Sequence, residues 1–159
     1  MREYTVASHD WANFSEAIPA IVARLQGVII ERRPAAQVIA REDRPDTLFY
    51  VDPPYMFETR SQKRIGNDLY HGYRHELDDE AHAALLQQLV ELCGMVVVSG
   101  YATAFYDQAL AGWLRVEKQA MADRGEARTE VLWINPRASA ALEAERLAEH
   151  MPLFVGGAA

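Results

Sequence analysis

The 159-residue sequence has one cysteine and no long apolar run. Cys93 has no second thiol to pair with inside the chain, and no group of cysteines and histidines has the spacing of a zinc site. No stretch is long and apolar enough to cross a bilayer, and the N-terminus, MREYTVASHDWANF, does not have the basic-then-apolar layout of a signal peptide. We therefore expect a cytoplasmic protein with no metal site and no membrane contact.

The chain also lacks an excess of basic residues, because its formal net charge is −7. Phosphate contacts supply most of the non-specific affinity for nucleic acids, so this charge argues against a surface that grips DNA or RNA throughout. Residues 58–75 differ, since basic residues are interleaved there with tyrosines and histidines. This segment is either a solvated loop or a local nucleic-acid contact. Its candidate phosphate-binding residues are Arg60, Lys63, Arg64 and Arg74.

The composition, 50% hydrophobic and 25% charged, is ordinary for one folded domain of this length. The spacing of apolar residues predicts where helices and strands lie. The expected helices are 15–25, 34–43, 75–92 (capped by Asp78 or Asp79), 102–112 and 138–150. The expected strands are 28–33, 47–51, 95–101, 113–119 and 129–135, of which 95–101 is apolar enough to be buried on both faces.

Strands and helices alternate as far as residue 112, which predicts an α/β fold with a mostly parallel sheet and helices on both faces. The last two strands are joined by a polar loop that leaves no room for a crossover helix, so they suit an antiparallel hairpin. Trp113 and Trp133 are expected to face each other across this hairpin as packing residues. We expect one domain over residues 1–159, in which 137–159 form a C-terminal helix and a frayed tail.

An acid and two prolines follow the apolar strand at 47–51. Proline cannot donate a hydrogen bond to a sheet and restricts the residue before it to extended geometry, so the strand must end at Asp52. The turn presents Asp52, Pro53, Pro54 and Tyr55 at the C-terminal edge of a sheet, where ligands bind in open α/β folds. The same tetrapeptide can also be a turn that merely ends a strand.

Such a turn suits a planar substrate with an exocyclic amino group. The lone pair of the adenine amino group is delocalised into the ring, which makes the nitrogen a poor nucleophile. The Asp52 carboxylate and the Pro53 carbonyl oxygen can accept both amino hydrogens and hold the nitrogen in a more tetrahedral state, which is catalysis by positioning and fixed dipoles. Tyr55 can stack on a base drawn out of its helix, and Pro54, like Pro53, leaves no backbone donor to compete for the carboxylate.

The sequence resembles Dam-like adenine-N6 DNA methyltransferases over most of residues 13–136. The blocks TLFYVDPPYMFETR, YRHELDDEAH, VVVSGY, AGWLRVEKQ and RTEVLWINP all look like this family and occur in its order. The resemblance implies an enzyme that uses S-adenosylmethionine to methylate DNA. It implies that Asp52 and Pro53 hold the target amino group and that Tyr55 stacks on the base. It places three more residues in the same pocket: Ser99, Gly100 and Tyr101.

The family's glycine-rich turn for the methyl donor, and the acid for the donor's ribose, are not found upstream of Asp52. The segment 28–33 looks like the third strand of the family, and Arg33 and Pro34 stand where an acidic or amide residue is usual. We therefore expect an incomplete, truncated Rossmann-like methyltransferase sheet. A homodimer or a companion chain is expected to supply the missing strands, because unpaired sheet edges are otherwise exposed.

Two rival interpretations stay open. One is an inactive remnant or subunit that acts as a binding module, and the other is a methyltransferase that acts on RNA or on a protein amide. A hydrolase is not indicated, because Ser99 has no evident partner histidine and acid. His71, His75 and His82 have no ligand spacing with other donors, which favours surface positions over a metal site.

Overall fold

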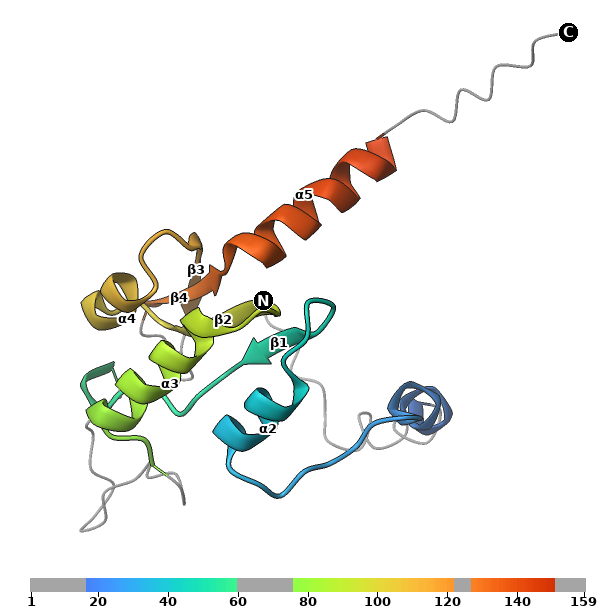
Figure 1. Cartoon of the computed structure of the whole chain (residues 1–159), viewed down its shortest axis with the longest axis horizontal. Helices are drawn as coiled ribbons and strands as arrows, with labels where there is room; N and C mark the ends of the chain where they lie inside the picture. The colour runs from blue at the N-terminus through green and yellow to red at the C-terminus, as the bar shows by residue number, and fades with distance from the viewer. Residues whose placement is uncertain (1–16, 60–75, 122–126, 151–159) are drawn as a thin grey trace, which may run out of the picture. The chain divides into compact units, whose positions relative to one another are not determined.

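A computed structural model describes residues 17–59, 76–121 and 127–150, and its elements are drawn in Figure 1. The chain divides into two compact units, residues 1–33 and residues 34–159. Among the described residues, no helix has both the length and the apolar character that a membrane span requires.

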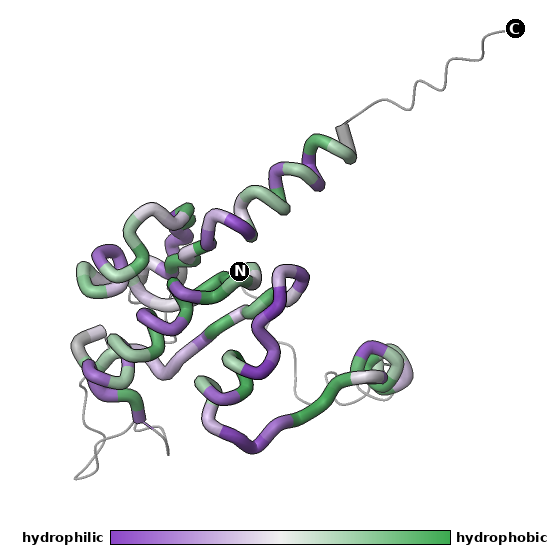
Figure 2. Tube along the Cα trace, in the orientation of Figure 1, coloured by the Kyte–Doolittle hydropathy of each residue, from purple (hydrophilic) through white to green (hydrophobic). Residues whose placement is uncertain are grey.

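In the first unit, residues 17–25 are helical and Gly27 follows with a φ of 84°. The segment 28–33 is not a strand, so the expectation of a strand there is wrong. Ile29 and Ile30 are 82% and 93% exposed, and Figure 2 shows 28–30 as a continuous apolar stretch. β-branched residues favour a strand, but a strand also needs a neighbour for its backbone hydrogen bonds. No described strand pairs with this segment.

The second unit contains a four-stranded sheet in the order β1-β2-β4-β3. β1 is parallel to β2, and the pairings β2-β4 and β3-β4 are antiparallel. The described part is thus a mixed α/β sheet, consistent with an incomplete Rossmann-like sheet, and the expected C-terminal hairpin is confirmed. The strand bounds are β1 Leu48–Val51, β2 Met95–Tyr101, β3 Leu114–Met121 and β4 Ala127–Ile134.

The two tryptophans do not face each other across the hairpin. Trp133 pairs with Arg115 of β3, whereas Trp113 precedes the first residue of that strand. Trp133 is 1% exposed and packs in the core, so the expectation that it is a packing residue is confirmed. The register therefore differs by two residues from the expected one.

Local hydrogen bonds set where the helices begin. The Asp78 side chain accepts a 2.8 Å bond from the Ala81 N–H, which confirms Asp78 as the cap of the long helix. Thr103 Oγ1 accepts a 3.2 Å bond from the Tyr106 N–H in the same way. The helices are α2 Ala35–Glu42, α3 Asp79–Glu91, α4 Ala104–Ala109 and α5 Pro136–His150, with a short 3-10 turn, η1, at Phe57–Thr59.

One face of the sheet, the core face, carries Val96, Val98, Val131 and Trp133, all 1% exposed or less. Side chains from three helices complete this core: Ile39 of α2, Leu86 and Leu89 of α3, and Tyr106 of α4, with Leu110 just beyond it. Burying such side chains stabilises the fold by about 1.5–3 kcal/mol each. The core therefore holds together the end of β1, the end of β2 and α4.

The opposite face of the sheet, the open face, is partly uncovered. Leu48 and Tyr50 of β1 are 59% and 65% exposed, and Leu114 and Val116 of β3 are exposed as well. In β2 only alternate residues are fully buried, so the expectation of a strand buried on both faces is wrong for this strand. The apolar composition of β2 predicts burial on both faces, whereas the structure fully buries side chains on one face only.

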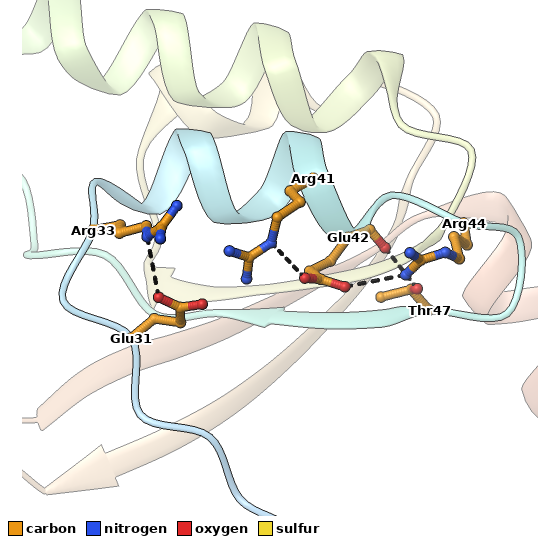
Figure 3. A network of polar contacts seen from close by, with 6 residues as sticks. All are labelled: Glu31, Arg33, Arg41, Glu42, Arg44 and Thr47. Carbon is orange, nitrogen blue, oxygen red and sulfur yellow. Dashed lines mark hydrogen bonds and ion pairs between the residues drawn. The ribbon is translucent and has the colours of Figure 1, made fainter.

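Glu42, at the end of α2, is the centre of the polar contacts that Figure 3 shows. Its carboxylate accepts hydrogen bonds from Arg41 Nε at 2.6 Å and from Arg44 Nη1 at 3.1 Å. Thr47 Oγ1 donates to the Glu42 carbonyl oxygen at 2.7 Å. The bond from Arg41, followed by that from Arg44, lowers the pKa of Glu42. These contacts set the short connection between α2 and β1.

Asp43 and Asn135 tie the start of β2 to its neighbours. The Asp43 carboxylate accepts hydrogen bonds from the N–H groups of Cys93 and Gly94 at 3.1 and 2.9 Å. Asn135, which is 5% exposed, donates to the Gly94 carbonyl oxygen at 2.9 Å and accepts from the Val96 N–H at 3.1 Å. Its Oδ1 also accepts from the Ala138 N–H at 2.9 Å, which caps α5. β2 is therefore held from both sides where it begins.

Candidate active site

The site begins where β1 ends. Val51 is the last residue of the strand, Asp52 is exposed, and Pro53 is buried. Pro54 and Tyr55 are half-buried, and the chain then turns into η1. The two prolines end the strand as their chemistry requires, so the acid stands at the sheet edge and reaches solvent.

The end of β2 lies beside this turn. Val51 pairs with Val98, which places Ser99 next to Asp52. Ser99 Oγ donates a hydrogen bond to Asp52 Oδ1 at 3.0 Å. The parallel pairing of β1 and β2 therefore brings together two of the sequence-derived candidates that lie 47 positions apart.

A small pocket lies at this edge of the sheet. It receives side chains from the turn after β1, from the end of β2 and from the start of α4. Five of the seven expected pocket and catalytic residues line it directly, namely Pro53, Tyr55, Ser99, Gly100 and Tyr101. The remaining lining residues are Met56, Thr59, Thr103 and Tyr106.

Two aromatic rings form one wall of the pocket. The ring centroids of Tyr55 and Tyr101 are 4.4 Å apart, and the ring planes are inclined at 43°. Tyr55 comes from the turn after β1, and Tyr101 is the last residue of β2. The two rings thus meet at an angle and line the pocket together.

Tyr106 lies deeper and is 4% exposed. Its ring packs on Trp133 at 5.2 Å between centroids, and its hydroxyl oxygen is 2.8 Å from Nδ1 of His82. Burial raises the pKa of Tyr106 to about 12, so the phenol is neutral at ordinary pH. His82 is fully buried on α3, which corrects the expectation of a surface position.

Sequence reasoning missed Met56, Thr59, Thr103 and Tyr106 as lining residues. Thr103 carries a usable signal, because threonine just before a helix is a typical cap, and here the cap fixes the start of α4 beside the pocket. The same cap fixes the position of Tyr106, because Tyr106 is the third residue of α4 and its N–H donates to Thr103 Oγ1. Met56 and Thr59 depend on the path of the turn after Tyr55, which no local pattern specifies.

Neither the predicted phosphate contacts nor a donor-binding turn is seen among the described residues. The candidate phosphate-binding residues Arg60, Lys63, Arg64 and Arg74 lie outside the described residues. The described part also contains no strand before β1, and therefore no glycine-rich turn from such a strand to a helix. The described residues thus do not fit a complete site for S-adenosylmethionine, whereas they do form a pocket beside Asp52.

Comparison with known proteins identifies the family of the chain. No curated protein matches the chain. The family described as D12 class N6 adenine-specific DNA methyltransferase matches residues 4–122, which include the turn after β1 and all of β2, α4 and β3. This match covers well over half of the 159 residues. The chain therefore belongs to the D12 class N6 adenine-specific DNA methyltransferase family.

Proposed function

We propose that this chain forms the acceptor-base half of an enzyme that transfers a methyl group from S-adenosylmethionine to N6 of adenine in DNA. The observation that carries the proposal is the exposed Asp52 carboxylate, which is hydrogen-bonded to Ser99 beside a pocket that Tyr55 and Tyr101 line. Membership of the D12 class family supports it. In the overall reaction a bond forms between the amino nitrogen and the methyl carbon as the bond from that carbon to the donor sulfur breaks, S-adenosylhomocysteine is the leaving group, and one amino hydrogen leaves as a proton.

In this proposal the residues of the turn after β1 act on the amino group. Asp52 and the Pro53 carbonyl oxygen accept its two hydrogens, which draws the lone pair out of conjugation with the ring and aims it at the methyl donor. Pro53 and Pro54 keep the turn stiff and add no N–H group that competes for the carboxylate. Tyr55 stacks on the extruded base, and Tyr101 supports the Tyr55 ring at 4.4 Å between centroids.

A second chain is part of the proposal. β1 is the edge strand of the described sheet, and Leu48 and Tyr50 on its open face are exposed. An uncovered edge strand with apolar side chains favours pairing with another chain. We propose that a second copy or a companion chain covers this edge and contributes to donor binding. The four basic residues Arg60, Lys63, Arg64 and Arg74 are proposed to contact DNA phosphates.

Two other functions remain as outcomes of the tests. A binding module that keeps the fold but does not bind the donor gives no heat with S-adenosylmethionine, with or without DNA. A methyltransferase with another acceptor transfers label to RNA or to a protein amide instead of DNA. Single-stranded DNA, duplex DNA and RNA are therefore assayed side by side with labelled donor.

The deciding experiment is incorporation of labelled methyl groups into DNA, followed by mass spectrometry for N6-methyladenine. Asp52→Ala is expected to abolish incorporation without changing the melting temperature, because the Asp52 side chain is exposed. The control is Asp46→Ala, which removes another exposed carboxylate, in the turn before β1. Undiminished methylation by the Asp52→Ala protein refutes the assigned role.

A further inference from the structure

Ser99 is placed by the pairing of three strands. It is the fifth residue of β2, it pairs with Leu132 of β4, and its neighbour Val98 pairs with Val51 of β1. The backbone at Ser99 therefore has little freedom to shift. Its hydroxyl group lies within reach of two oxygen atoms at the end of β1, Asp52 Oδ1 at 3.0 Å and the Val51 carbonyl oxygen at 3.4 Å.

The hydroxyl has one proton and can donate fully to one acceptor at a time. The Asp52 carboxylate is the closer acceptor, and a bond to an ionised acceptor is stronger than a bond to a neutral carbonyl oxygen. Ser99 therefore holds Oδ1. Once Oδ1 is held, the plane of the carboxylate is set, and the direction of Oδ2 is set with it.

Oδ2 is the oxygen that faces no hydrogen-bond donor among the described residues. An exposed aspartate without a partner rotates among several positions about its side-chain bonds. A substrate amino group that meets such a carboxylate must also order it, which costs free energy. A carboxylate already held through one oxygen avoids that cost at the other oxygen.

We propose that Ser99 is a positioning residue that orients Asp52, so that Oδ2 is aimed at the amino group of the acceptor base. The inference rests on the proposed function, because it assigns to Ser99 a task in the same site. Ser99 acts through Asp52 in this proposal. Ser99 also lines the pocket, so its side chain can affect the reaction through pocket shape as well as through Asp52. Ser99→Thr separates these two effects, because it keeps the hydroxyl group and changes the shape of the side chain.

The first test compares steady-state kinetics of two variants. Ser99→Ala removes the hydroxyl and is expected to lower kcat for adenine methylation by about 10- to 100-fold, with the KM for DNA within about twofold, because misaligned reacting groups cost rates of that order. Ser99→Thr retains the hydroxyl and suits a strand, so it is expected to restore kcat to within about threefold of the unchanged protein. Ser139→Ala, on α5, is the matched control. A kcat unchanged in Ser99→Ala overturns the proposal.

The second test does not depend on methyl transfer. Crystal structures of the unchanged protein and of Ser99→Ala are expected to show Asp52 in one position in the first and in several positions in the second. If Asp52 occupies the same single position in both, Ser99 does not orient it. In a third outcome, the protein without substitutions transfers no methyl group while the Ser99→Ala crystal shows Asp52 in several positions. That pair of results contradicts the proposed function and still supports the positioning role.

Discussion

Nδ1 of His82 and the hydroxyl oxygen of Tyr106 are 2.8 Å apart in the interior of the second unit, and His82 has no exposed surface. His82 lies in α3 and Tyr106 in α4, so this bond joins two helices that cover the core face of the sheet. The Tyr106 ring also lines the pocket beside Asp52. The position of that pocket wall thus depends on a polar bond buried behind it.

Loss of the Tyr106 hydroxyl is expected to destabilise the fold. Tyr106→Phe keeps the ring that packs on Trp133 but removes the buried hydrogen bond to His82, and a buried polar group left without its partner costs about 1–3 kcal/mol. Chemical denaturation of the variant and of the unchanged protein measures the difference. Tyr50→Phe is the control, because Tyr50 is 65% exposed, and its effect is expected to stay within about 0.5 kcal/mol. Equal stabilities of the two variants contradict the prediction.

Removal of the Asn135 side chain is also expected to destabilise the fold. Asn135→Ala leaves the Gly94 carbonyl oxygen and the Val96 N–H without this partner at the start of β2 and removes the cap of α5. We expect a loss of about 1–3 kcal/mol in the free energy of unfolding. Gln87→Ala, on the exposed side of α3, is the matched control and is expected to change little. The prediction is wrong if both variants unfold at the same denaturant concentration.

Gly94 is expected to tolerate no larger side chain. A Cβ atom at this position lies 3.0 Å from Phe49 Cε2 and from the Thr47 carbonyl oxygen, and 3.1 Å from the Arg44 carbonyl oxygen. Because two of these neighbours are backbone atoms, Gly94→Ala is expected to cost about 1–3 kcal/mol. Gly100→Ala is the comparison, since its Cβ meets only the Trp133 ring, at 3.4 Å. Thermal unfolding that ranks Gly100→Ala as the less stable variant contradicts this reasoning.

Acidification is expected to lower stability through Asp43. The hydrogen bond from the Cys93 N–H, assisted by the bond from Gly94, lowers the pKa of Asp43 in the folded protein. A carboxyl group with a depressed folded pKa adds stability that is complete above its unfolded pKa, about 3.9, and is lost as the pH falls through the lower folded value. Denaturation from pH 6 to pH 2 measures this slope. Asp43→Ala is expected to flatten it, and an unchanged slope in that variant rules out the assignment.

Tyr55 is expected to contribute to DNA binding through its ring. Tyr55→Ala is expected to weaken binding of adenine-containing single-stranded DNA by about 1–3 kcal/mol, the usual contribution of one base stacked on an aromatic ring. Tyr55→Phe keeps the ring and is expected to retain most of the affinity. Fluorescence anisotropy with a labelled oligonucleotide measures both. Equal losses in the two variants point to the hydroxyl group, and no loss in either removes stacking from the proposal.

Sequence reasoning predicted best where local chemistry decides the outcome. The end of β1 at Asp52 follows from two prolines, and the start of α3 follows from the Asp78 side chain. The placement of Ser99 in the same pocket as Asp52 was implied by the resemblance to the family, and the pairing of β1 with β2 brings the two residues to a hydrogen bond. For the end of β1 and the start of α3, the signal lies within a few residues.

The errors fall where the outcome depends on distant partners. The segment 28–33 has the composition of a strand, yet pairing depends on a neighbour that no local pattern supplies. His82 is itself polar, and only the packing of α3 against α4 shows that it is buried. The register of the hairpin, which pairs Trp133 with Arg115, depends on where β3 and β4 begin and end.

The open face of the sheet bears on how the purified chain behaves in solution. Leu48, Tyr50, Leu114 and Val116 offer water an apolar surface that spans both edge strands. Sulfate ions strengthen the association of such surfaces because they are excluded from protein. We expect early salting-out by ammonium sulfate and enhanced fluorescence of hydrophobic dyes such as ANS, and both effects diminish if a partner covers the face.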